Sequence, residues 1–484
     1  MTTSNIQEVT VVDRMQTLTA ENIDGIHNAT LDVLNQTGVA FHDPDACVLF
    51  KKNGFRVNDK VVRFTGKQVQ EALSTAPESF RIAARNPDKS VTVGNDDWVF
   101  APTYGPPFLV NADGTRQPGT MADYEAFCKL VQTSTYINVN GYKHVEPQDI
   151  PSSTAYLDMV LANMVLCDKP FIGSSDSRQA ARDCIEMAGM VFGGRDALVK
   201  TPVMISLVNS LSPLQFASEM AGTILEMAHY RQPIIIANMV MGGTSGPVTL
   251  PELLVLMNAE ILAGVVLAQL AGPGTPVIYG TTSCATNMKT GAAAVGTPET
   301  AIISSMAIQL ARFYHLPSRT GGSLTDASQP DAQALAEGAL LLSTAVRSGA
   351  NFILHACGML DCYMGNSFEK WLIDEELCGM IRRMTTPIDI NPTRINIGII
   401  DRVGIGGNYL TEPETLEHCR TAFFPYALYD KEDSSSQPSQ DNATVIQKAS
   451  KQLDQRLGNY EKPDMGPDLE ADLARFVAKR KENQ

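Results

Sequence analysis

The stretch Phe352-Ile353-Leu354-His355-Ala356-Cys357-Gly358 decides the fold. Its apolar residues are typical of a buried β-strand, and its polar end is typical of a strand that leads into a loop. The stretch Leu316-Pro317-Ser318-Arg319-Thr320-Gly321-Gly322, one unit earlier, has the same design. If the two strands are parallel neighbours, Arg319 and His355 lie side by side at one rim of a barrel.

Upstream of this stretch, runs of strand length alternate with helical segments. We expect strands at 98–101 or 108–110, and at 137–140, 170–174, 202–208, 233–237, 276–280, 317–321 and 352–356. We expect helices at 121–133, 152–168, 177–192, 213–230, 250–271, 297–313, 329–348 and 366–384. The spacing between strands leaves room for the helical crossovers that parallel strands require.

Eight strand–helix units predict an α/β fold, namely a TIM (β/α)8 barrel with its active site at the carboxyl ends of the strands. We assign the barrel to residues 98–386, between an N-terminal α+β extension over 1–97 and a C-terminal helical tail over 387–484. The extension begins with a helix over 20–36, and the tail has a flexible linker at 433–438. The polar tail helices pack on the outside of the barrel or on a neighbouring subunit, and we expect a homo-oligomer.

Several helix starts carry capping residues. Ser212-Pro213-Leu214-Gln215 matches a capping box with proline in the first turn, and Thr297 precedes a proline and an acidic residue. Asp176 is expected to cap the helix that follows it. Because such starts recur just after the strands, they support the β–α alternation.

Composition excludes several classes of partner. The chain has 38 basic and 53 acidic residues, a net charge of −15, which argues against nucleic acid and anionic membranes. The first 13 residues lack the features of a signal peptide. The most apolar helix carries Asn258 and Glu260, which favours a core helix over a membrane span. Nine cysteines without a CxxC pair indicate a reducing, cytoplasmic location.

Motifs of the commoner enzyme classes do not appear. No G-x-S-x-G elbow, P-loop or strand-linked G-x-G-x-x-G occurs, so nothing indicates hydrolysis, phosphoryl transfer or hydride transfer. The seven histidines lack HxH or HExxH spacing. A site formed by His355, Cys357 and Cys362 is conceivable, but zinc favours a fuller ligand set, and we expect no tightly held metal.

Arg319 and His355 each have two explanations. A buried arginine is costly unless it is paired, so Arg319 either forms an ion pair with an acidic residue of the rim or binds a substrate carboxylate. His355 is either a structural histidine or part of the site. Two polar strand ends on adjacent strands favour the functional explanation for both.

Aromatic residues near the predicted rim suggest a site for a cation. Tyr104 and Phe108 lie in the segment Pro102-Thr103-Tyr104-Gly105-Pro106-Pro107-Phe108, and Tyr363 follows the last strand. Rings of this kind hold a quaternary ammonium group by cation–π attraction. Trp371 falls within the last predicted helix, where we expect a core position.

Four segments together resemble the trimethylamine methyltransferase family. They are Gly242-Gly243-Thr244-Ser245-Gly246-Pro247-Val248-Thr249-Leu250, Asn258-Ala259-Glu260-Ile261-Leu262-Ala263-Gly264, Gly296-Thr297-Pro298-Glu299 and Thr325-Asp326-Ala327-Ser328-Gln329-Pro330-Asp331-Ala332-Gln333. The resemblance covers nearly the whole chain. The founding trimethylamine enzymes carry pyrrolysine in the segment matching 325–331, where this chain has only standard residues, so the resemblance points to relatives that demethylate quaternary amines.

The resemblance implies a methyltransferase that moves a methyl group from glycine betaine to the Co(I) of a corrinoid (cobalamin) held by a partner corrinoid protein. It also implies site roles. Arg319 pairs with the carboxylate of the betaine, and His355 hydrogen-bonds that carboxylate or lines the methyl-transfer path. Tyr104 and Tyr363, with Phe108, surround the ammonium. The remaining positions are glycines that let the corrin ring approach the backbone: Gly242, Gly243, Gly246, Gly321 and Gly322.

Two alternatives stay open. Within the family, the substrate is another quaternary amine, such as proline betaine, carnitine or γ-butyrobetaine, and pocket size decides between them. Outside it, the chain is a non-catalytic or metal-dependent TIM-barrel protein that binds a small acid. A quaternary amine needs no acid to protonate its leaving group, which agrees with the missing acid–base motifs.

Overall fold

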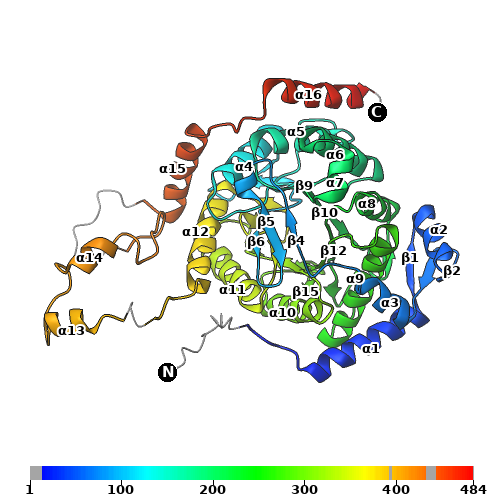
Figure 1. The fold of residues 1–484 in the computed structure, drawn as a ribbon, viewed down its shortest axis with the longest axis horizontal. Helices are drawn as coiled ribbons and strands as arrows, with labels where there is room; N and C mark the ends of the chain where they lie inside the picture. The colour runs from blue at the N-terminus through cyan, green and yellow to red at the C-terminus, as the bar shows by residue number, and fades with distance from the viewer. Residues whose placement is uncertain (1–13, 392–394, 432–442, 483–484) are drawn as a thin grey trace, which may run out of the picture.

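The computed structural model describes residues 14–391, 395–431 and 443–482 (Figure 1). The linker predicted at 433–438 lies outside these residues. Residues 1–13, in which we expected no signal peptide, also lie outside them. The fold is α/β, as predicted.

Parallel strands form the centre of the molecule, and helices surround them (Figure 1). Seven strands form a curled sheet in the order β6-β18-β17-β14-β12-β10-β9. Their bounds are β6 (Val99–Phe100), β9 (Phe171–Gly173), β10 (Met204–Asn209), β12 (Ile234–Asn238), β14 (Val277–Thr281), β17 (Ser318–Gly321) and β18 (Phe352–Leu354). Every neighbouring pair is parallel, so the carboxyl ends of all seven strands meet at one end of the sheet.

The predicted strand at 137–140 is reduced to isolated bridges. Ile137 pairs in parallel with Phe100 of β6, and Asn140 pairs in parallel with Phe171 of β9. The segment therefore lies between the two edge strands of the curled sheet. The alternative first strand, 108–110, joins a separate sheet of order β19-β20-β7-β8, with bounds β19 (Met359–Leu360), β20 (Gly365–Asn366), β7 (Phe108–Val110) and β8 (Arg116–Pro118).

Eight helices follow the strands near their predicted positions. They are α4 (Met121–Thr133), α5 (Ala155–Leu166), α6 (Arg178–Phe192), α8 (Ser218–His229), α9 (Leu250–Ala271), α10 (Pro298–Phe313), α11 (Ala332–Ser348) and α12 (Phe368–Thr385). A further short helix, α7 (Arg195–Lys200), follows α6. By length and composition α9 could cross a membrane, but 83% of its most apolar window is buried inside the fold, as in a core helix. Trp371 of α12 is fully buried, as predicted.

Two of the predicted helix starts are wrong. The Ser212–Pro213 peptide bond is cis and α8 begins only at Ser218, so no capping box forms there. Instead the carboxylate of Glu260 accepts hydrogen bonds from the Ser212 hydroxyl and the Leu214 amide, both at 2.8 Å. The residue that caps α6 is Ser177, so the carboxylate of Asp176 is not used as a helix cap.

The N-terminal extension packs on the helices around the curled sheet and pairs with the loop before α8. Its elements are α1 (Ala20–Gln36), β1 (Val39–Phe41), α2 (Pro44–Lys52), β2 (Arg56–Asn58), β3 (Val61–Arg63), α3 (Gly66–Leu73), β4 (Ser79–Ile82), η1 (Pro87–Lys89) and β5 (Val91–Gly94). Strand β1 pairs in parallel with β11 (Gln215–Phe216), which belongs to the loop before α8. The predicted division at residue 97 stays a prediction.

The tail has two parts. Helix α15 (Val445–Gly458) packs on α12 and α4, and α16 (Pro467–Glu482) packs on α5 and α6, so both helices lie outside the layer of helices that surrounds the sheet (Figure 1). Between α12 and α15 the chain carries α13 (Ile397–Val403) and α14 (Pro413–His418) on a segment that projects away from the body (Figure 1).

Candidate functional site

The two strands that the sequence singled out are parallel neighbours. Arg319 of β17 is in register with Phe352 of β18, and Gly321 with Leu354. His355 follows β18 directly and has a left-handed backbone, with φ of 57°. For a residue with a side chain this conformation is uncommon, and it concentrates at sites where the surroundings impose it. The backbone therefore aims His355 at the same end of the sheet as Arg319.

Arg319 is buried without an acidic partner. Its side chain is 2% exposed, and Nη1 donates a hydrogen bond to the carbonyl oxygen of Thr281 at 3.2 Å. Its Nε has no hydrogen-bond partner. Within the described part of the chain no carboxylate forms an ion pair with it, so the ion-pair explanation is not supported there. Burial lowers the pKa of Arg319 to about 10, and the guanidinium stays cationic at neutral pH.

His355 is neutral and has a defined tautomer. The backbone N–H of Tyr104 donates to Nδ1 at 3.3 Å, so the ring proton is on Nε2. Burial and the charge of Arg319 hold the pKa of His355 well below its usual value. At neutral pH the ring therefore offers one N–H donor beside a guanidinium.

Two predicted tyrosines surround these groups. The ring of Tyr363 lies 5.2 Å from that of His355, and its hydroxyl donates to the Thr282 carbonyl at 3.5 Å. Burial raises the pKa of Tyr104 to about 12 and also raises that of Tyr363, so both phenols stay protonated. Phe108 lies in β7 opposite Gly365, and its place in the site stays a prediction.

Three residues of this region were missed from the sequence. The hydroxyl of Tyr142 donates to Asp176 at 2.5 Å, and the ammonium of Lys143 lies 2.9 Å from the same carboxylate. The rings of Tyr142 and Tyr104 are 6.1 Å apart. Tyr142 and Lys143 follow the 137–140 segment, and Asp176 follows β9. Their position after predicted strands was the available signal, but Asp176 had been assigned to a helix cap.

A buried ion pair connects the loops that follow β17 and β18. Lys370 and Asp374 are both fully buried and 2.6 Å apart. Asp374 accepts hydrogen bonds from the Ser323 hydroxyl at 2.7 Å and from the Gly358 amide at 2.8 Å. The Ser323 amide in turn donates to the carbonyl of His355 at 2.8 Å. The loops after β17 and β18 are thus fixed relative to each other.

Packing already explains several of the predicted cofactor glycines. A Cβ at Gly246 would collide with Val240, one at Gly321 with Leu324, and one at Gly322 with the Cα of Ala356. Gly243 has a left-handed φ of 95°, which favours glycine. Gly242 belongs to β13 (Met241–Gly242), which pairs with β15 (Cys284–Thr286), and β15 pairs with β16 (Ala293–Ala294). A role for these glycines toward a corrin ring stays a prediction.

The conceivable metal site at His355, Cys357 and Cys362 does not assemble. The sulfur of Cys357 lies 3.9 Å from that of Cys378 of α12. The thiol of Cys362 instead donates a hydrogen bond to Asp326 at 2.9 Å. Over the residues that the structure describes, no group of three histidine, cysteine, aspartate or glutamate side chains is arranged to hold a metal ion. All nine cysteines are free.

Comparison with known proteins places this geometry in context. Residues 2–484 match the model of one family, described as trimethylamine methyltransferase. The chain is 38% identical to a glycine betaine methyltransferase of Desulfitobacterium hafniense, covering 96% of each chain. It is 30% identical to a proline betaine:corrinoid methyltransferase of Eubacterium limosum, over 95% of this chain and 96% of the relative.

More distant relatives extend the comparison to trimethylamine enzymes and to solved structures. A trimethylamine methyltransferase of Methanosarcina barkeri is 30% identical over 95% of this chain and 94% of its own length. The crystal structure of the monomethylamine methyltransferase of Methanosarcina barkeri superposes with a TM-score of 0.52 at 14% identity, covering 81% of this chain and 79% of that one. The structural match shows a common fold.

Proposed function

This chain belongs to the trimethylamine methyltransferase family, and from this premise we propose that it moves a methyl group from a carboxylated quaternary amine to a corrinoid held by a partner protein. The protein is a methyltransferase, and glycine betaine is the substrate we favour, because the relative named for it is 38% identical. The observation that carries the proposal is Arg319, a buried cation that lacks an acidic partner among the described residues.

The carboxylate of a betaine satisfies this cation. The free Nε of Arg319 and the guanidinium nitrogens beside it offer the fork that a carboxylate accepts in a bidentate way. The Nε2–H of His355 offers a further donor. A neutral amine without a carboxylate would leave Arg319 unpaired, and this favours betaines over trimethylamine as substrates.

The quaternary ammonium fits the aromatic part of the site. The ring of Tyr363 lies 5.2 Å from that of His355, and the rings of Tyr104 and Tyr142 lie 6.1 Å apart. We infer that these three rings surround the ammonium, and each contributes about 0.5–2 kcal/mol of cation–π attraction. Asp176 is already paired with Lys143, so recognition of the cation rests on the rings. All three phenols keep their protons, because burial raises their pKa values.

The reaction makes few demands on proton chemistry. The nitrogen of a quaternary amine leaves as a neutral tertiary amine, so no side chain has to protonate it. His355 is therefore not required as an acid, which agrees with its neutral state. The corrinoid, when bound, supplies the nucleophilic cobalt. The chain orients the substrate and excludes water.

The loops at this end of the sheet fit an apolar, planar partner group. Exposed apolar side chains lie on three of them: Met239 and Val248 after β12, Met288 after β14 and Met364 after β18. Methionine adapts its shape to flat surfaces. We infer that these loops, with Gly242 and Gly243, form the surface that meets the corrin ring.

We also infer that the curled sheet closes into a complete (β/α)8 barrel, with the segment 137–140 as the eighth member. Support comes from its parallel bridges to both edge strands.

The free cysteines support a reducing, cytoplasmic location.

A spectroscopic assay tests the reaction. The purified protein is mixed with chemically reduced cob(I)alamin and one amine at a time, and formation of methylcobalamin is followed by its absorbance. We expect a signal with glycine betaine and weaker signals with proline betaine, carnitine and γ-butyrobetaine. Choline, which has the ammonium but no carboxylate, should be inactive.

Two outcomes contradict the proposal. Equal rates with choline and glycine betaine would show that Arg319 does not bind a substrate carboxylate. A lack of signal with every amine, repeated with the native corrinoid protein as acceptor, would favour a binding protein for small acids.

A further inference from the structure

The loop after β18 forms a hairpin whose turn has an unusual backbone. Strands β19 and β20 pair in antiparallel fashion, and residues 361–364 form the turn between them. Asp361, Cys362 and Tyr363 have left-handed φ values of 53°, 51° and 74°. The Met364 amide donates to the Asp361 carbonyl at 2.9 Å and closes the turn. Hairpin turns with positive φ at both central residues favour Asn-Gly, whereas this turn has Cys-Tyr.

The position of Tyr363 depends on this backbone. A left-handed conformation is unfavourable for a bulky residue, and it persists only where the surrounding structure imposes it. The ring of Tyr363 lies 5.2 Å from the ring of His355, which follows β18 and is left-handed as well. The turn therefore brings an aromatic ring to the candidate site, and contacts from outside the turn must hold it there.

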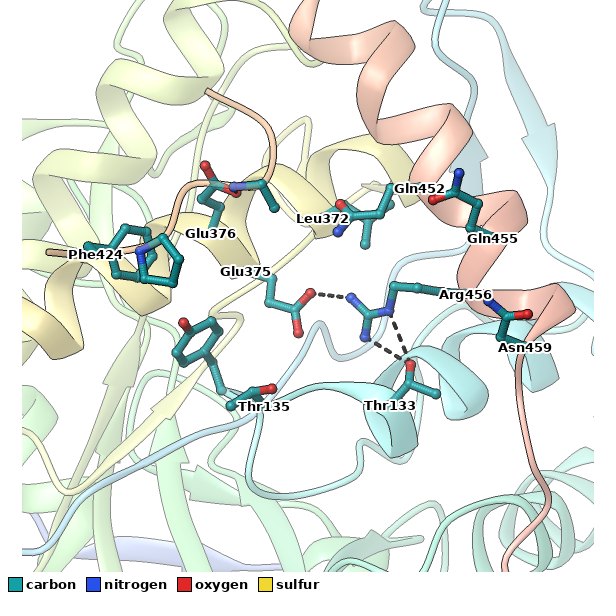
Figure 2. Close-up of a pocket in the computed structure, with 13 residues that line it drawn as sticks. Thr133, Thr135, Leu372, Glu375, Glu376, Phe424, Gln452, Gln455, Arg456 and Asn459 are labelled. Atoms are coloured by element: carbon teal, nitrogen blue, oxygen red, sulfur yellow. Dashed lines mark hydrogen bonds and ion pairs between the residues drawn. The ribbon is translucent and has the colours of Figure 1, made fainter. Parts of the chain in front are cut away.

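The base of the hairpin is fixed on both sides. Before β19, the Gly358 amide donates to the carboxylate of Asp374 at 2.8 Å. After β20, helix α12 is connected to α15 and α4, because Arg456 pairs with Glu375 and donates to the Thr133 hydroxyl at 2.9 and 3.1 Å (Figure 2). These contacts fix where the hairpin begins and ends. The conformation of its turn depends on other partners.

The carboxylate of Asp326 contacts the turn at its centre. Its Oδ1 accepts a hydrogen bond from the Cys362 thiol at 2.9 Å. The same carboxylate accepts hydrogen bonds from the amides of Val295 and Gly296, at 2.7 and 3.2 Å. Burial and the hydrogen bond to Asp326 raise the pKa of Cys362, so the thiol keeps the proton that it donates. Asp326 thus connects the turn to the loop that follows β14.

Helix α11 holds Asp326 in place through Glu337. The Asp326 amide donates to Oε2 of Glu337 at 2.9 Å, and the Thr325 hydroxyl donates to the same oxygen at 2.6 Å. A Cβ at Gly296 would lie 2.1 Å from that oxygen, so glycine lets the backbone approach the carboxylates closely. The Cys362 amide also donates to the Thr325 carbonyl at 3.2 Å. Asp326 therefore meets the thiol from a fixed position.

A second contact with the turn is weaker. Arg116 of β8 forms an ion pair with Asp361 at 2.8 Å, and the arginine side chain is 41% exposed. Exposed ion pairs contribute little to stability. Aspartate also adopts a left-handed backbone more readily than cysteine or tyrosine does, so Asp361 needs the least support. The turn therefore depends more on Asp326 than on Arg116.

We infer that Asp326 is a positioning residue for methyl transfer: through Cys362 it holds the turn that places the ring of Tyr363 against the ammonium of the substrate. The inference rests on the proposed function, because the ring acts on the cation of a betaine. Asp326 itself does not touch the substrate. Without its hydrogen bond the turn relaxes and the ring withdraws, and the loss of one ring weakens the binding of an ammonium group about 3–10-fold.

Two ligands of the same shape test the inference by isothermal titration calorimetry. Glycine betaine carries a quaternary ammonium, and 3,3-dimethylbutyrate has the same carboxylate with a neutral carbon in place of the nitrogen. We expect Asp326→Asn to raise the Kd for glycine betaine about 3–10-fold and the Kd for 3,3-dimethylbutyrate by less than about twofold. Tyr363→Leu should show the same selectivity, and Asp326→Asn should add no further loss to that variant.

Two further variants control the experiment. Asp331→Asn is the matched control, because Asp331 lies in the same segment and its carboxylate accepts hydrogen bonds from the amides of Gln333 and Ala334, at 3.0 and 3.1 Å, as the cap of α11. It should leave both Kd values unchanged. Cys362→Ala removes only the thiol and keeps Asp326, so it decides the question if Asp326→Asn fails to fold. It should also weaken the binding of glycine betaine selectively.

The outcomes separate this inference from the proposed function. Wild-type Kd values in Asp326→Asn and Cys362→Ala, or equal losses for both ligands, would overturn the inference while the wild type still binds and demethylates the betaine. Additive losses in Asp326→Asn, Tyr363→Leu would also overturn it, because the two residues would then act independently. A wild type that does not bind glycine betaine would overturn the proposed function, and the inference with it.

Discussion

At the scale of single residues, the surroundings of Arg319 support the proposal of a carboxylated substrate. A buried guanidinium costs several kcal/mol unless its donors are satisfied, and Arg319 has one carbonyl partner at 3.2 Å and a free Nε. His355 beside it cannot compensate, because it is neutral and offers a donor of its own. Under the proposed function, a substrate carboxylate is the acceptor for the guanidinium of Arg319 and for the Nε2–H of His355.

Replacing this cation should remove selectivity for carboxylated substrates. We expect Arg319→Met to lower kcat/KM for glycine betaine by about 10²-fold, because a buried charge-assisted hydrogen bond contributes about 1.5–3 kcal/mol. Its activity on tetramethylammonium, which has no carboxylate, should change by less than about threefold. Methylcobalamin formation measures both rates.

Arg312→Met is the matched control for this variant. Arg312 belongs to α10 and donates to the Ser348 carbonyl at 2.8 Å, before the strand that leads to His355. Its replacement should leave both rates near the wild-type values. Equal losses on both substrates in Arg319→Met would mean that the arginine supports the fold of the site instead of binding the carboxylate.

The pH dependence of binding follows from the pKa values of the same two residues. Arg319 has a pKa of about 10 without ligand, and a bound carboxylate raises it. The Kd for glycine betaine should therefore stay constant from pH 6 to about 9 and increase above pH 10, by up to tenfold per pH unit. Isothermal titration calorimetry measures this profile. A step near pH 6.5 would show instead that His355 becomes charged.

At the scale of elements, sequence patterns located the helices well and their starts less well. The bounds of α1, α4 and α9 match the prediction, because a threonine precedes the first turn of each helix and a long stretch rich in apolar residues follows it. At Ser212 the same cap pattern misled, because Glu260, 48 residues later in the chain, takes the hydroxyl and imposes a turn. A local pattern cannot reveal a competing partner so far along the chain.

The grouping of the candidate site residues was predicted in part. Arg319 and His355 were expected to lie side by side because both interrupt apolar strands, and β17 and β18 are indeed parallel neighbours. Their roles toward a substrate stay predictions. Tyr142 and Asp176 were missed because they pair with each other across 34 residues and only the fold brings them to Tyr104. The 137–140 segment was predicted as a full strand, but only its ends pair, so its length in the sheet could not be read from composition.

Removal of one member of the ion pair between Lys370 and Asp374 should leave the other member as a buried, unpaired charge. Lys370→Met leaves a buried carboxylate without its cation, and we expect a loss of about 3–5 kcal/mol in the free energy of unfolding. The double variant Lys370→Met, Asp374→Asn should lose less than the sum of the two single variants. Urea unfolding measures all three. Strictly additive losses would show that the two groups act independently.

His144 should make the fold sensitive to acid. It is fully buried, its Nε2 lies 2.8 Å from the Oδ1 of Asn140, and burial lowers its pKa to about 3, from about 6.5 in the unfolded chain. Between these values the unfolded state binds the additional proton, so stability is complete above pH 6.5 and is lost as the pH falls. We expect His144→Gln to reduce the loss between pH 6.5 and 5 by about 1–2 kcal/mol.

Urea unfolding at several pH values checks this expectation through the slope of stability against pH, not its absolute value. The comparison with His229→Gln, at an exposed position near the end of α8, controls for the loss of a histidine as such. Equal slopes in wild type and His144→Gln would show that His144 stays neutral in the unfolded state as well, or gains a partner on protonation.

At the scale of the whole molecule, the two ends of the curled sheet differ. Arg319, His355, Tyr104 and Tyr363 lie at the carboxyl ends of the strands, and exposed methionines lie on the loops there. At the opposite end of the sheet α12 ends, and the segment 395–423 projects away from the body (Figure 1). The prediction from sequence that the tail helices pack on the outside of the strand–helix core is confirmed for α15 and α16. The projecting segment 395–423, between α12 and α15, was missed, because its isoleucines are scattered among polar residues and form no helical stripe.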